Sequence, residues 1–174
     1  MSQINRPAKA WEKEFTKLME RTLIILKPDA VQRGYVGQIV TRFENKGLQL
    51  AGMKLMVIPK ETAETHYAPH KERPFYAGLV RFMTSGPVVV LALQGVNAIT
   101  IARNLMGATF GSKAAPGTIR GDFGVSNAYN LIHGSDSPEA AEKELGLFFK
   151  KEELLDWTPS IQTWVYDMTG AKPE

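Results

Sequence analysis

Two short, unbroken apolar runs constrain the fold of this chain more than any other feature of its sequence. Residues 22–26 (TLIIL) and 88–93 (VVVLAL) are rich in β-branched and aliphatic side chains. Neither run alternates with polar residues, as a strand with one solvent-facing side would, so both are typical of strands buried on both faces. The fold must therefore place these two strands in the middle of a sheet.

Helical periodicity and chain-breaking residues define the remaining elements. The pattern predicts helices at 36–46, 61–73, 75–83, 97–106 and 138–149, further strands at 48–58 and 129–133, an extended piece at 163–166 and a loop at 107–124. Pro69 interrupts the second of these helices. The order predicts an α+β fold, a ferredoxin-like split βαβ with a four-stranded antiparallel sheet and a helical insertion before the third strand.

An extra N-terminal helix is predicted before the first strand. Trp11, Phe15, Leu18 and Met19 fall at i, i+4, i+7 and i+8, which is one stripe of a 3.6-residue period. We expect this amphipathic helix to pack on its own domain or on a neighbouring subunit. The chain then divides into an N-terminal extension (1–19), a single domain (20–167) and a polar tail (168–174).

The composition excludes several classes of function. The chain has no cysteine, so disulfides, thiolate catalysis and cysteine-ligated zinc cannot occur. Its 21 Lys and Arg against 18 Asp and Glu give a net charge of +3 without basic clusters, so no specific nucleic-acid or membrane binding is expected. The longest apolar run has six residues, whereas a membrane span needs roughly 20. The first nine residues lack the apolar core of a secretory signal, which favours the cytoplasm.

His133 ends a predicted buried strand and is followed by Gly134, which lets the backbone turn immediately. The next three residues, Ser-Asp-Ser, are good helix N-caps, and Pro138 suits the first helical position. The imidazole would then be held at the rim of a cleft near a helix N-terminus, where negative charge is favoured. A histidine in this position is expected to face an anion.

Glu144 lies within about one helical step of the apolar stripe formed by Ala141, Leu145 and Phe148. In one interpretation this carboxylate holds one ring nitrogen of His133, fixes the tautomer and leaves the other nitrogen as a free nucleophile. In the other, the carboxylate reaches solvent from the edge of the stripe. The helical pattern alone leaves both interpretations open.

Cations at the ends of elements favour a polyphosphate ligand. Lys27 ends the first strand, Arg103 lies one turn from the end of its helix, and Arg120 lies in the glycine-containing segment 116–123 (PGTIRGDF). Each alone is typical of a solvated charge, but three of them together with His133 favour phosphate binding. The chain has no Walker-type G-x-x-x-x-G-K-[ST] sequence, so a P-loop is not the explanation.

His66 and His70 have the i, i+4 spacing that suits zinc on a helix. Pro69 lies between them, and no acidic third ligand is evident in the sequence. No protein metal site is therefore expected at this pair.

Five segments together resemble the nucleoside diphosphate kinases. In order they are ERTLIILKPDAVQRG, HYAPHKERPFYAGLV, SGPVVVLALQG, PGTIRGDF and NLIHGSDS, and the resemblance extends over about 20–167. It implies a ping-pong enzyme that moves the γ-phosphoryl group of a nucleoside triphosphate to a nucleoside diphosphate through a phosphohistidine, maintaining NTP and dNTP pools. It also implies Mg²⁺ carried by the nucleotide phosphates, and a homo-oligomer that is either a hexamer or a tetramer. The extended C-terminal segment expected through 164–167 favours the hexamer.

The resemblance assigns roles to particular residues. His133 matches the phosphorylated histidine, and Glu144 matches the carboxylate that orients it. The phosphate contacts would come from Lys27, Tyr67, Arg103, Thr109 and Arg120, the contacts near the ribose 3′-hydroxyl from Lys27 and Asn130, and the stacking surface for the base from Phe75. Because Lys27 would contact both a phosphate and the region of the ribose 3′-hydroxyl, we expect it to be catalytic together with His133 and Glu144.

Two positions depart from the family pattern, which usually has a proline at Gly111 and often an apolar residue at Asn127. The first departure affects a loop that contributes to subunit contacts, and the second affects the border of the base. Two rival functions also stay open at this point. One is a nucleotide sensor or nucleic-acid binder without turnover, and the other is a histidine phosphocarrier that would not need Phe75 or Asn130.

Overall fold

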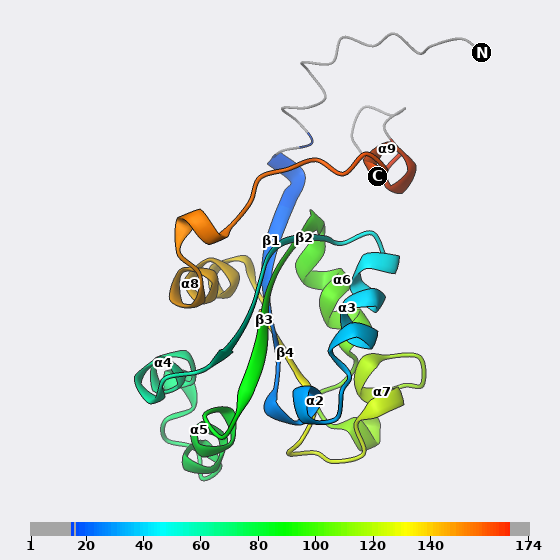
Figure 1. The fold of residues 1–174 in the computed structure, drawn as a ribbon. Helices are drawn as coiled ribbons and strands as arrows, with labels where there is room; N and C mark the ends of the chain where they lie inside the picture. Colours follow the sequence, from blue (N-terminus) through cyan, green and yellow to red (C-terminus); the bar gives the residue numbers. More distant parts are fainter. Residues whose placement is uncertain (1–14, 16, 168–174) are drawn as a thin grey trace, which may run out of the picture.

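The computed structural model describes residues 15 and 17–167 of the 174-residue chain. A four-stranded sheet forms its centre, with strand order β2-β3-β1-β4 and antiparallel pairing throughout (Figure 1). The strands are β1 (Met19–Leu26), β2 (Gln49–Val57), β3 (Pro87–Val96) and β4 (Ile132–Gly134). The two apolar runs are β1 and β3, and both are central, as the sequence predicts.

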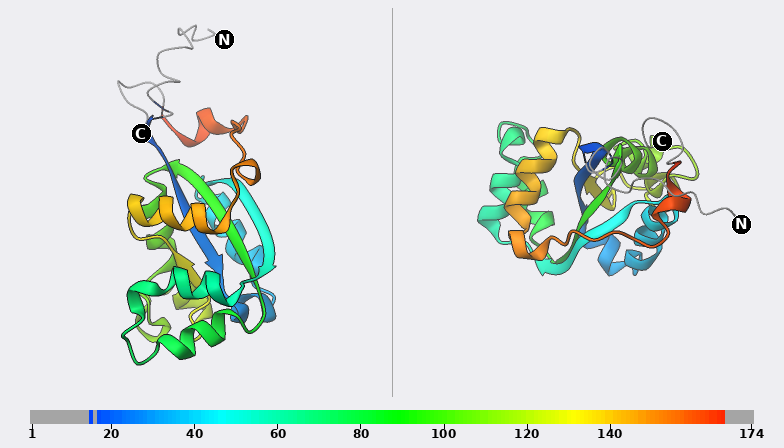
Figure 2. Two further views of the ribbon diagram at one scale, coloured as in Figure 1. Left: turned by 90° about the vertical axis from the view of Figure 1, so that its left-hand side faces the viewer. Right: turned by 90° about the horizontal axis from the view of Figure 1, so that it is seen from above.

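Helices cover both faces of the sheet (Figures 1 and 2). The α-helices are α2 (Pro28–Gln32), α3 (Val36–Asn45), α4 (Lys60–His66), α5 (Tyr76–Met83), α6 (Ala98–Met106), α7 (Ile119–Phe123), α8 (Pro138–Phe148) and α9 (Gln162–Val165). Short 3-10 turns are η1 (Ala68–His70), η2 (Gly111–Lys113) and η3 (Lys151–Glu153). Figure 1 places α3, α6 and α7 on one face and α4, α5 and α8 on the other.

Alternate residues of β1 enter two separate hydrophobic cores. Ile24 and Leu26 pack with Phe43 of α3 on one face, whereas Leu23 and Ile25 pack with Phe148 of α8 on the other. All four β1 side chains are fully buried. The absence of polar alternation in this strand therefore follows from helices on both sides of the sheet. The α+β ferredoxin-like fold is confirmed.

Only the end of the predicted N-terminal helix falls within the described residues, and its earlier part, with Trp11, lies outside them. Of its stripe, Phe15, Leu18 and Met19 are described; residues 15, 17 and 18 are helical, and β1 already begins at Met19. Phe15 is buried, and its ring meets that of Tyr166 edge-on with centroids 5.2 Å apart. The end of the extension is thus packed on its own domain.

The extended piece predicted at 163–166 is wrong, because Gln162–Val165 form the short helix α9. Trp164 and Val165 favour a strand by propensity. However, the backbone bonds of this segment are local, with Trp164 N–H donating to the Ile161 carbonyl and Tyr166 N–H to the Gln162 carbonyl. A strand needs a partner along a sheet edge, and this segment makes local turns instead.

The predicted strand 129–133 begins three residues later, at Ile132. Leu131 has a φ of 69°, in the left-handed region, which interrupts the extended backbone. The predicted loop 107–124 likewise contains α7, whose N-cap Thr118 accepts a hydrogen bond from the Gly121 N–H. Short local turns of this kind have no periodicity from which to predict them.

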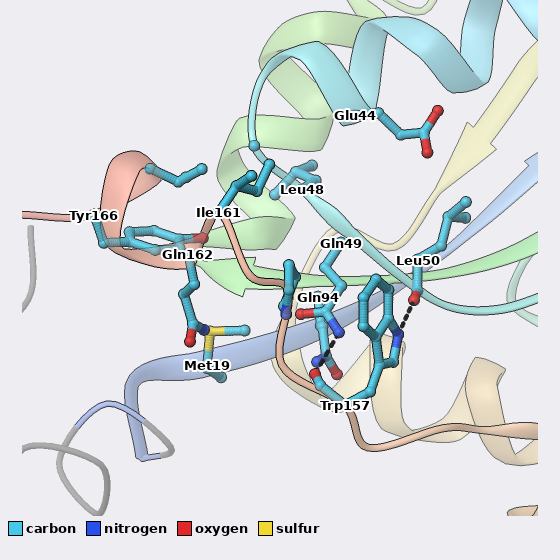
Figure 3. Close-up of a pocket in the computed structure, with 13 residues that line it drawn as sticks. Met19, Glu44, Leu48, Gln49, Leu50, Gln94, Trp157, Ile161, Gln162 and Tyr166 are labelled. Carbon is cyan, nitrogen blue, oxygen red and sulfur yellow. Dashed lines mark hydrogen bonds between the residues drawn. The ribbon is translucent and has the colours of Figure 1, made fainter. Parts of the chain in front are cut away.

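The C-terminal segment crosses the sheet near the starts of β1 and β2 (Figure 3). Leu155 N–H donates to the Ala51 carbonyl at 2.8 Å, and the Trp157 indole donates to the Leu50 carbonyl at 2.9 Å. This segment encloses a mostly apolar pocket that Met19, at the start of β1, helps to line. His133 pairs with Ile25 near the opposite end of β1, so this pocket is remote from the histidine. No helix in the described part of the chain is long and apolar enough to cross a membrane.

Candidate active site

The strand β4 fixes the direction in which His133 points. His133 is the register partner of Ile25 in the antiparallel β1–β4 pair. Directly paired residues lie on the same face of a sheet. Because Ile25 belongs to the core beneath α4, α5 and α8, the imidazole is directed to that side. Its side chain is 24% exposed, so it is held firmly but is open to a ligand.

Glu144 is brought to His133 by the start of α8. The Ser137 hydroxyl caps this helix by accepting a hydrogen bond from the Ala140 N–H at 3.1 Å, and Pro138 occupies the first turn, as the sequence predicts. Both carboxylate oxygens of Glu144 lie 3.1 Å from Nε2 of His133. The Ser135 hydroxyl donates to Oε2 at 2.6 Å. Of the two interpretations of Glu144, the structure supports the one in which it holds the histidine.

The electrostatics of this contact define the histidine tautomer. Burial opposes ionisation of Glu144, but the hydrogen bonds from His133 and Ser135 outweigh it, so the pKa of the carboxyl lies below its ordinary value. An ionised carboxylate can only accept hydrogen bonds, so the ring nitrogen that faces Glu144 must be the donor. The neutral imidazole therefore carries its proton on Nε2, and Nδ1 keeps its lone pair.

Lys27 and Asn130 form a directly bonded pair beside the histidine strand. The Lys27 ammonium donates to Oδ1 of Asn130 at 2.6 Å, and the Asn130 amide donates to the Thr109 carbonyl at 2.8 Å. Burial and the nearby Arg120 charge lower the pKa of Lys27 to about 8. A buried cation with a depressed pKa gains stability when an anion arrives. The pair thus places an undercompensated positive charge at the site.

The sequence predicts that Arg120 contacts phosphate, but most of its hydrogen bonds in the free protein go to backbone carbonyls. Its guanidinium donates to three carbonyls, those of Asn130 at 3.2 Å, Gly107 at 2.8 Å and Ile132 at 2.7 Å. Burial, followed by repulsion from Arg103, lowers the pKa of Arg120 to about 10. Three of its five N–H groups are therefore used in fixing loops, and the side chain acts on a ligand mainly through its charge.

Arg103, in α6, is exposed and reaches the same strand. Its guanidinium donates to the Gly134 carbonyl at 3.3 Å, one residue after His133. Together with the buried Arg120 it flanks β4. The structure therefore brings Lys27, Arg103, Arg120 and Asn130 together around the histidine strand.

The backbone before His133 is strained. Leu131 is fully buried, yet its φ of 69° is one that bulky residues rarely adopt. Its N–H donates to the Asp29 carboxylate at 3.1 Å, and its carbonyl accepts from the Lys27 N–H at 2.8 Å. Two hydrogen bonds from the β1–α2 junction thus hold the turn. A left-handed residue costs about 1–2 kcal/mol, and here it lies between Asn130 and the strand of His133.

Tyr67 contributes a buried hydroxyl to the site. Its ring centroid is 6.4 Å from that of His133, and the hydroxyl has no hydrogen-bond partner among the described residues. Burial, and to a smaller degree Glu144, raises the pKa of this phenol, so the group is a neutral donor. A buried hydroxyl without a partner is costly, and a ligand oxygen would satisfy it.

His66 is a site residue that sequence reasoning missed. Its side chain is only 1% exposed, and its ring meets that of His133 edge-on with centroids 4.6 Å apart. Burial, then the neighbouring His133, lowers the pKa of His66 to about 3, so it is neutral. No joint site was expected for His66 and His70, and the His70 ring lies beside that of Phe75, with centroids 5.8 Å apart. His66 reaches His133 because α4 packs against α8. This contact depends on tertiary packing, so no local sequence pattern predicts it.

The other predicted residues lie on exposed loops and helix ends. Phe75 precedes α5 and is 56% exposed, which leaves one aromatic face open. Thr109 is exposed in the loop after α6. Of the two departures from the family pattern, Asn127 is exposed and accepts a hydrogen bond from the Ser112 hydroxyl at 2.9 Å. Gly111 is buried against the backbone of Gly124.

Comparison with known proteins agrees with this geometry. A family model described as nucleoside diphosphate kinase matches residues 20–154. The chain is 55% identical over 149 residues to the nucleoside diphosphate kinase of Synechococcus sp. (strain JA-3-3Ab), covering 86% of this chain and 100% of that one. The nucleoside diphosphate kinase of Carboxydothermus hydrogenoformans is 56% identical over 149 residues, which again cover 86% of this chain and 100% of that one.

A solved structure shows the same likeness. The halophilic nucleoside diphosphate kinase of Halobacterium salinarum, in complex with CDP, superposes with a TM-score of 0.83 at 52% identity, covering 85% of this chain and 99% of that one. The family model spans well over half of the present chain, including His133, Glu144 and the three cations around them. The chain therefore belongs to the nucleoside diphosphate kinase family, whose members are phosphotransferases.

Proposed function

We propose that this kinase works by a ping-pong mechanism in which His133 accepts the γ-phosphoryl group of a nucleoside triphosphate and passes it to a nucleoside diphosphate. The observation that carries the proposal is the contact of Nε2 of His133 with both oxygens of Glu144, at 3.1 Å. It leaves Nδ1 as the nucleophile. The biological result would be the maintenance of NTP and dNTP pools.

The chemical step balances without an external base. The Nδ1 lone pair attacks the γ-phosphorus, the nitrogen–phosphorus bond forms, and the bond from phosphorus to the bridging oxygen breaks. The electron pair leaves with the β-phosphate of the diphosphate product. The ring proton stays on Nε2, hydrogen-bonded to Glu144, so no proton has to be removed from the nucleophile. A second nucleoside diphosphate reverses the same events.

The surrounding residues would act by position and charge, because a phosphoryl-transfer transition state is loose and highly charged. The proposed phosphate contacts are Lys27, Tyr67, Arg103, Thr109 and Arg120, with Lys27 and Asn130 near the ribose 3′-hydroxyl and Phe75 beneath the base. The unpartnered Tyr67 hydroxyl and the buried Lys27 charge support these roles. Stacking on one aromatic face distinguishes bases poorly, so we expect broad nucleotide tolerance.

Mg²⁺ would enter the site as part of the substrate, bound to nucleotide phosphates. The carboxylate beside His133, that of Glu144, already accepts hydrogen bonds from His133 and Ser135. The imidazoles near it are nitrogen donors, which suit Mg²⁺ poorly. The ion would neutralise phosphate charge, and the side chains of this chain would orient the nucleotide.

The working form would be a homo-oligomer, with a hexamer favoured over a tetramer. The edge strand β2 exposes Met53, Leu55 and Val57, each between 58% and 66% exposed. An apolar stripe on an open sheet edge is a surface that a second copy can cover. An extended C-terminal segment would favour the hexamer, but part of that segment forms the helix α9, which weakens this argument.

One labelling experiment tests the mechanism. The chain is incubated with γ-labelled ATP and Mg²⁺, acid-labile protein phosphate is measured, and GDP is then added to look for labelled GTP. We expect labelling that GDP discharges, and no labelling in His133→Ala, which should still bind nucleotide. Label that GDP does not discharge would indicate a phosphocarrier, and nucleotide binding without labelling would indicate a sensor. Label on the His133→Ala variant would refute the assignment.

A further inference from the structure

Three side chains at the site present ligand atoms at a spacing that suits a metal ion. One ligand atom each from His66, His133 and Glu144 lies within 4.8 Å of the other two. Nδ1 of His66 is 3.8 Å from Oε1 of Glu144, and Nε2 of His133 is 3.1 Å from both carboxylate oxygens. We propose that this His66–His133–Glu144 trio binds a transition-metal ion such as Zn²⁺, and that the bound ion switches off phosphoryl transfer. The inhibitory role rests on the function proposed above.

The buried His66 is the observation that points to a ligand. Its side chain is 1% exposed, and neither ring nitrogen has a hydrogen-bond partner within the described part of the chain. A buried polar group without a partner is destabilising by roughly 1–3 kcal/mol. A coordinate bond from Nδ1 would satisfy one of the two nitrogens. The position of His66, edge-on to His133, aims it at the same carboxylate that His133 contacts.

The two separations that involve Glu144 bracket the spacing that zinc coordination requires. Zn²⁺ binds imidazole nitrogen and carboxylate oxygen at about 2.0–2.2 Å, so tetrahedral ligand atoms lie about 3.3 Å apart. The observed separations of 3.1 and 3.8 Å lie on either side of that value. Three protein ligands leave a fourth position for water. The exposed part of the His133 side chain provides a route from solvent.

The donor set selects the ion. Two imidazoles and one glutamate match the His₂Glu arrangement of zinc sites, whereas Mg²⁺ prefers oxygen donors. The Mg²⁺ that accompanies the nucleotide should therefore not fill the trio. The chain has no cysteine, so no thiolate competes for the ion. Its three histidines are the two in the trio and His70, which supplies a control.

The ring protons make metal binding and phosphorylation mutually exclusive. In the resting site Nε2 carries the proton and Nδ1 the lone pair. To bind the ion, Nε2 must donate its own lone pair, so the proton moves to Nδ1 through water and the number of protons on the ring is unchanged. Nδ1 then has no lone pair with which to attack phosphorus. In the opposite case, a phosphoryl group on Nδ1 keeps the proton on Nε2, which cannot then coordinate metal.

Direct binding measurements on the nucleotide-free full chain test the site. Zn²⁺ affinity is measured by competition with a chromophoric chelator for the wild type, His66→Phe and His70→Phe, with folding checked by circular dichroism. We expect one tight site per wild-type chain, a loss of more than about 100-fold in affinity for His66→Phe, and no change for His70→Phe. Even an outer partner of a metal ligand is worth about 10–100-fold in affinity. Unchanged affinity in folded His66→Phe would overturn the proposal.

A second measurement needs no variant. Zn²⁺ binding is compared between wild-type chain before and after phosphorylation by ATP and Mg²⁺, once the nucleotide has been removed. Phosphorylated chain should fail to bind, and Zn²⁺ added first should block labelling until a chelator removes it. Equal binding by both forms, or labelling that Zn²⁺ leaves unaffected, contradicts the inhibitory role. If the chain binds Zn²⁺ through His66 but is never labelled without it, the proposed mechanism fails and the metal site stands.

Discussion

At the scale of single residues, the site consists of groups that are held in place and incompletely satisfied. His133 is oriented by Glu144, and the buried Lys27 has a pKa lowered by burial and by Arg120, which the nearby Asp29 carboxylate offsets only in part. The Tyr67 hydroxyl lacks a partner among the described residues. Such groups destabilise the free protein, and binding of an anionic substrate relieves this because it supplies the missing partners. Two predictions belong to this scale.

The first concerns the tautomer of His133. Glu144→Gln keeps the shape of the side chain, but its amide can donate to Nε2 and move the ring proton to Nδ1. We expect the rate of histidine phosphorylation to fall by about 10²–10⁴, as when an orienting carboxylate is replaced by an amide. Rapid-quench labelling measures this rate. Glu142→Gln, exposed on the same helix, is the control, and equal rates for both variants would show that the carboxylate is not required.

The second concerns Lys27, whose pKa of about 8 is below its ordinary value. Because the folded value is lowered, the free protein loses this charge as the pH rises through about 8. We expect the KM for nucleotide to rise above that pH, whereas kcat changes less because a bound phosphate raises the pKa again. Lys27→Arg keeps its charge to higher pH, so its KM should stay flat between pH 7 and 9. A flat wild-type profile would contradict this account.

At the scale of elements, the predictable features are those fixed by local pattern. The apolar runs of β1 and β3 and the Ser137 cap of α8 could be predicted because periodicity and capping are local properties. The contact of Glu144 with His133 could only be suggested as one of two possibilities. The positions of His66 and of Arg120 depend on which helices and loops meet across the sheet. The left-handed turn at Leu131 is set by hydrogen bonds to β1 and α2, far away in sequence.

The loop at Gly111 gives an element-scale prediction. A Cβ at this position would lie 1.9 Å from the Gly124 carbonyl oxygen, so any larger residue must displace backbone. We expect Gly111→Ala to lower the free energy of unfolding by about 1–3 kcal/mol. Gly146→Ala is the matched control, because a Cβ there meets nothing within 4 Å in α8 and should raise stability by about 0.4–1 kcal/mol. Thermal unfolding measures both, and equal effects would refute the steric argument.

At the scale of the whole molecule, the surface that would join copies in the proposed oligomer lies apart from the site. The edge strand β2 presents its apolar stripe at one side of the sheet, and the site lies at the other edge beside β4. Assembly through β2 would therefore leave the residues around His133 of each copy accessible to nucleotide. The chain could form an oligomer without blocking its own substrate.

A charge in the stripe tests this arrangement. We expect Leu55→Lys to reduce the particle mass measured by light scattering, because a buried unpaired lysine would be strongly unfavourable at an apolar interface. Thr100→Lys adds the same charge at an exposed position on α6 and should leave the mass unchanged. An unchanged mass for Leu55→Lys would show that this stripe does not join copies of the chain.

The bonds of Arg120 to three carbonyls have a mechanical consequence. The guanidinium joins the turn at Gly107 to the backbone on both sides of the strained Leu131. An anion that binds to this guanidinium therefore interacts, through its hydrogen bonds, with two separate loops. Nucleotide binding should therefore slow amide hydrogen exchange in both loops together, because one side chain couples their motions.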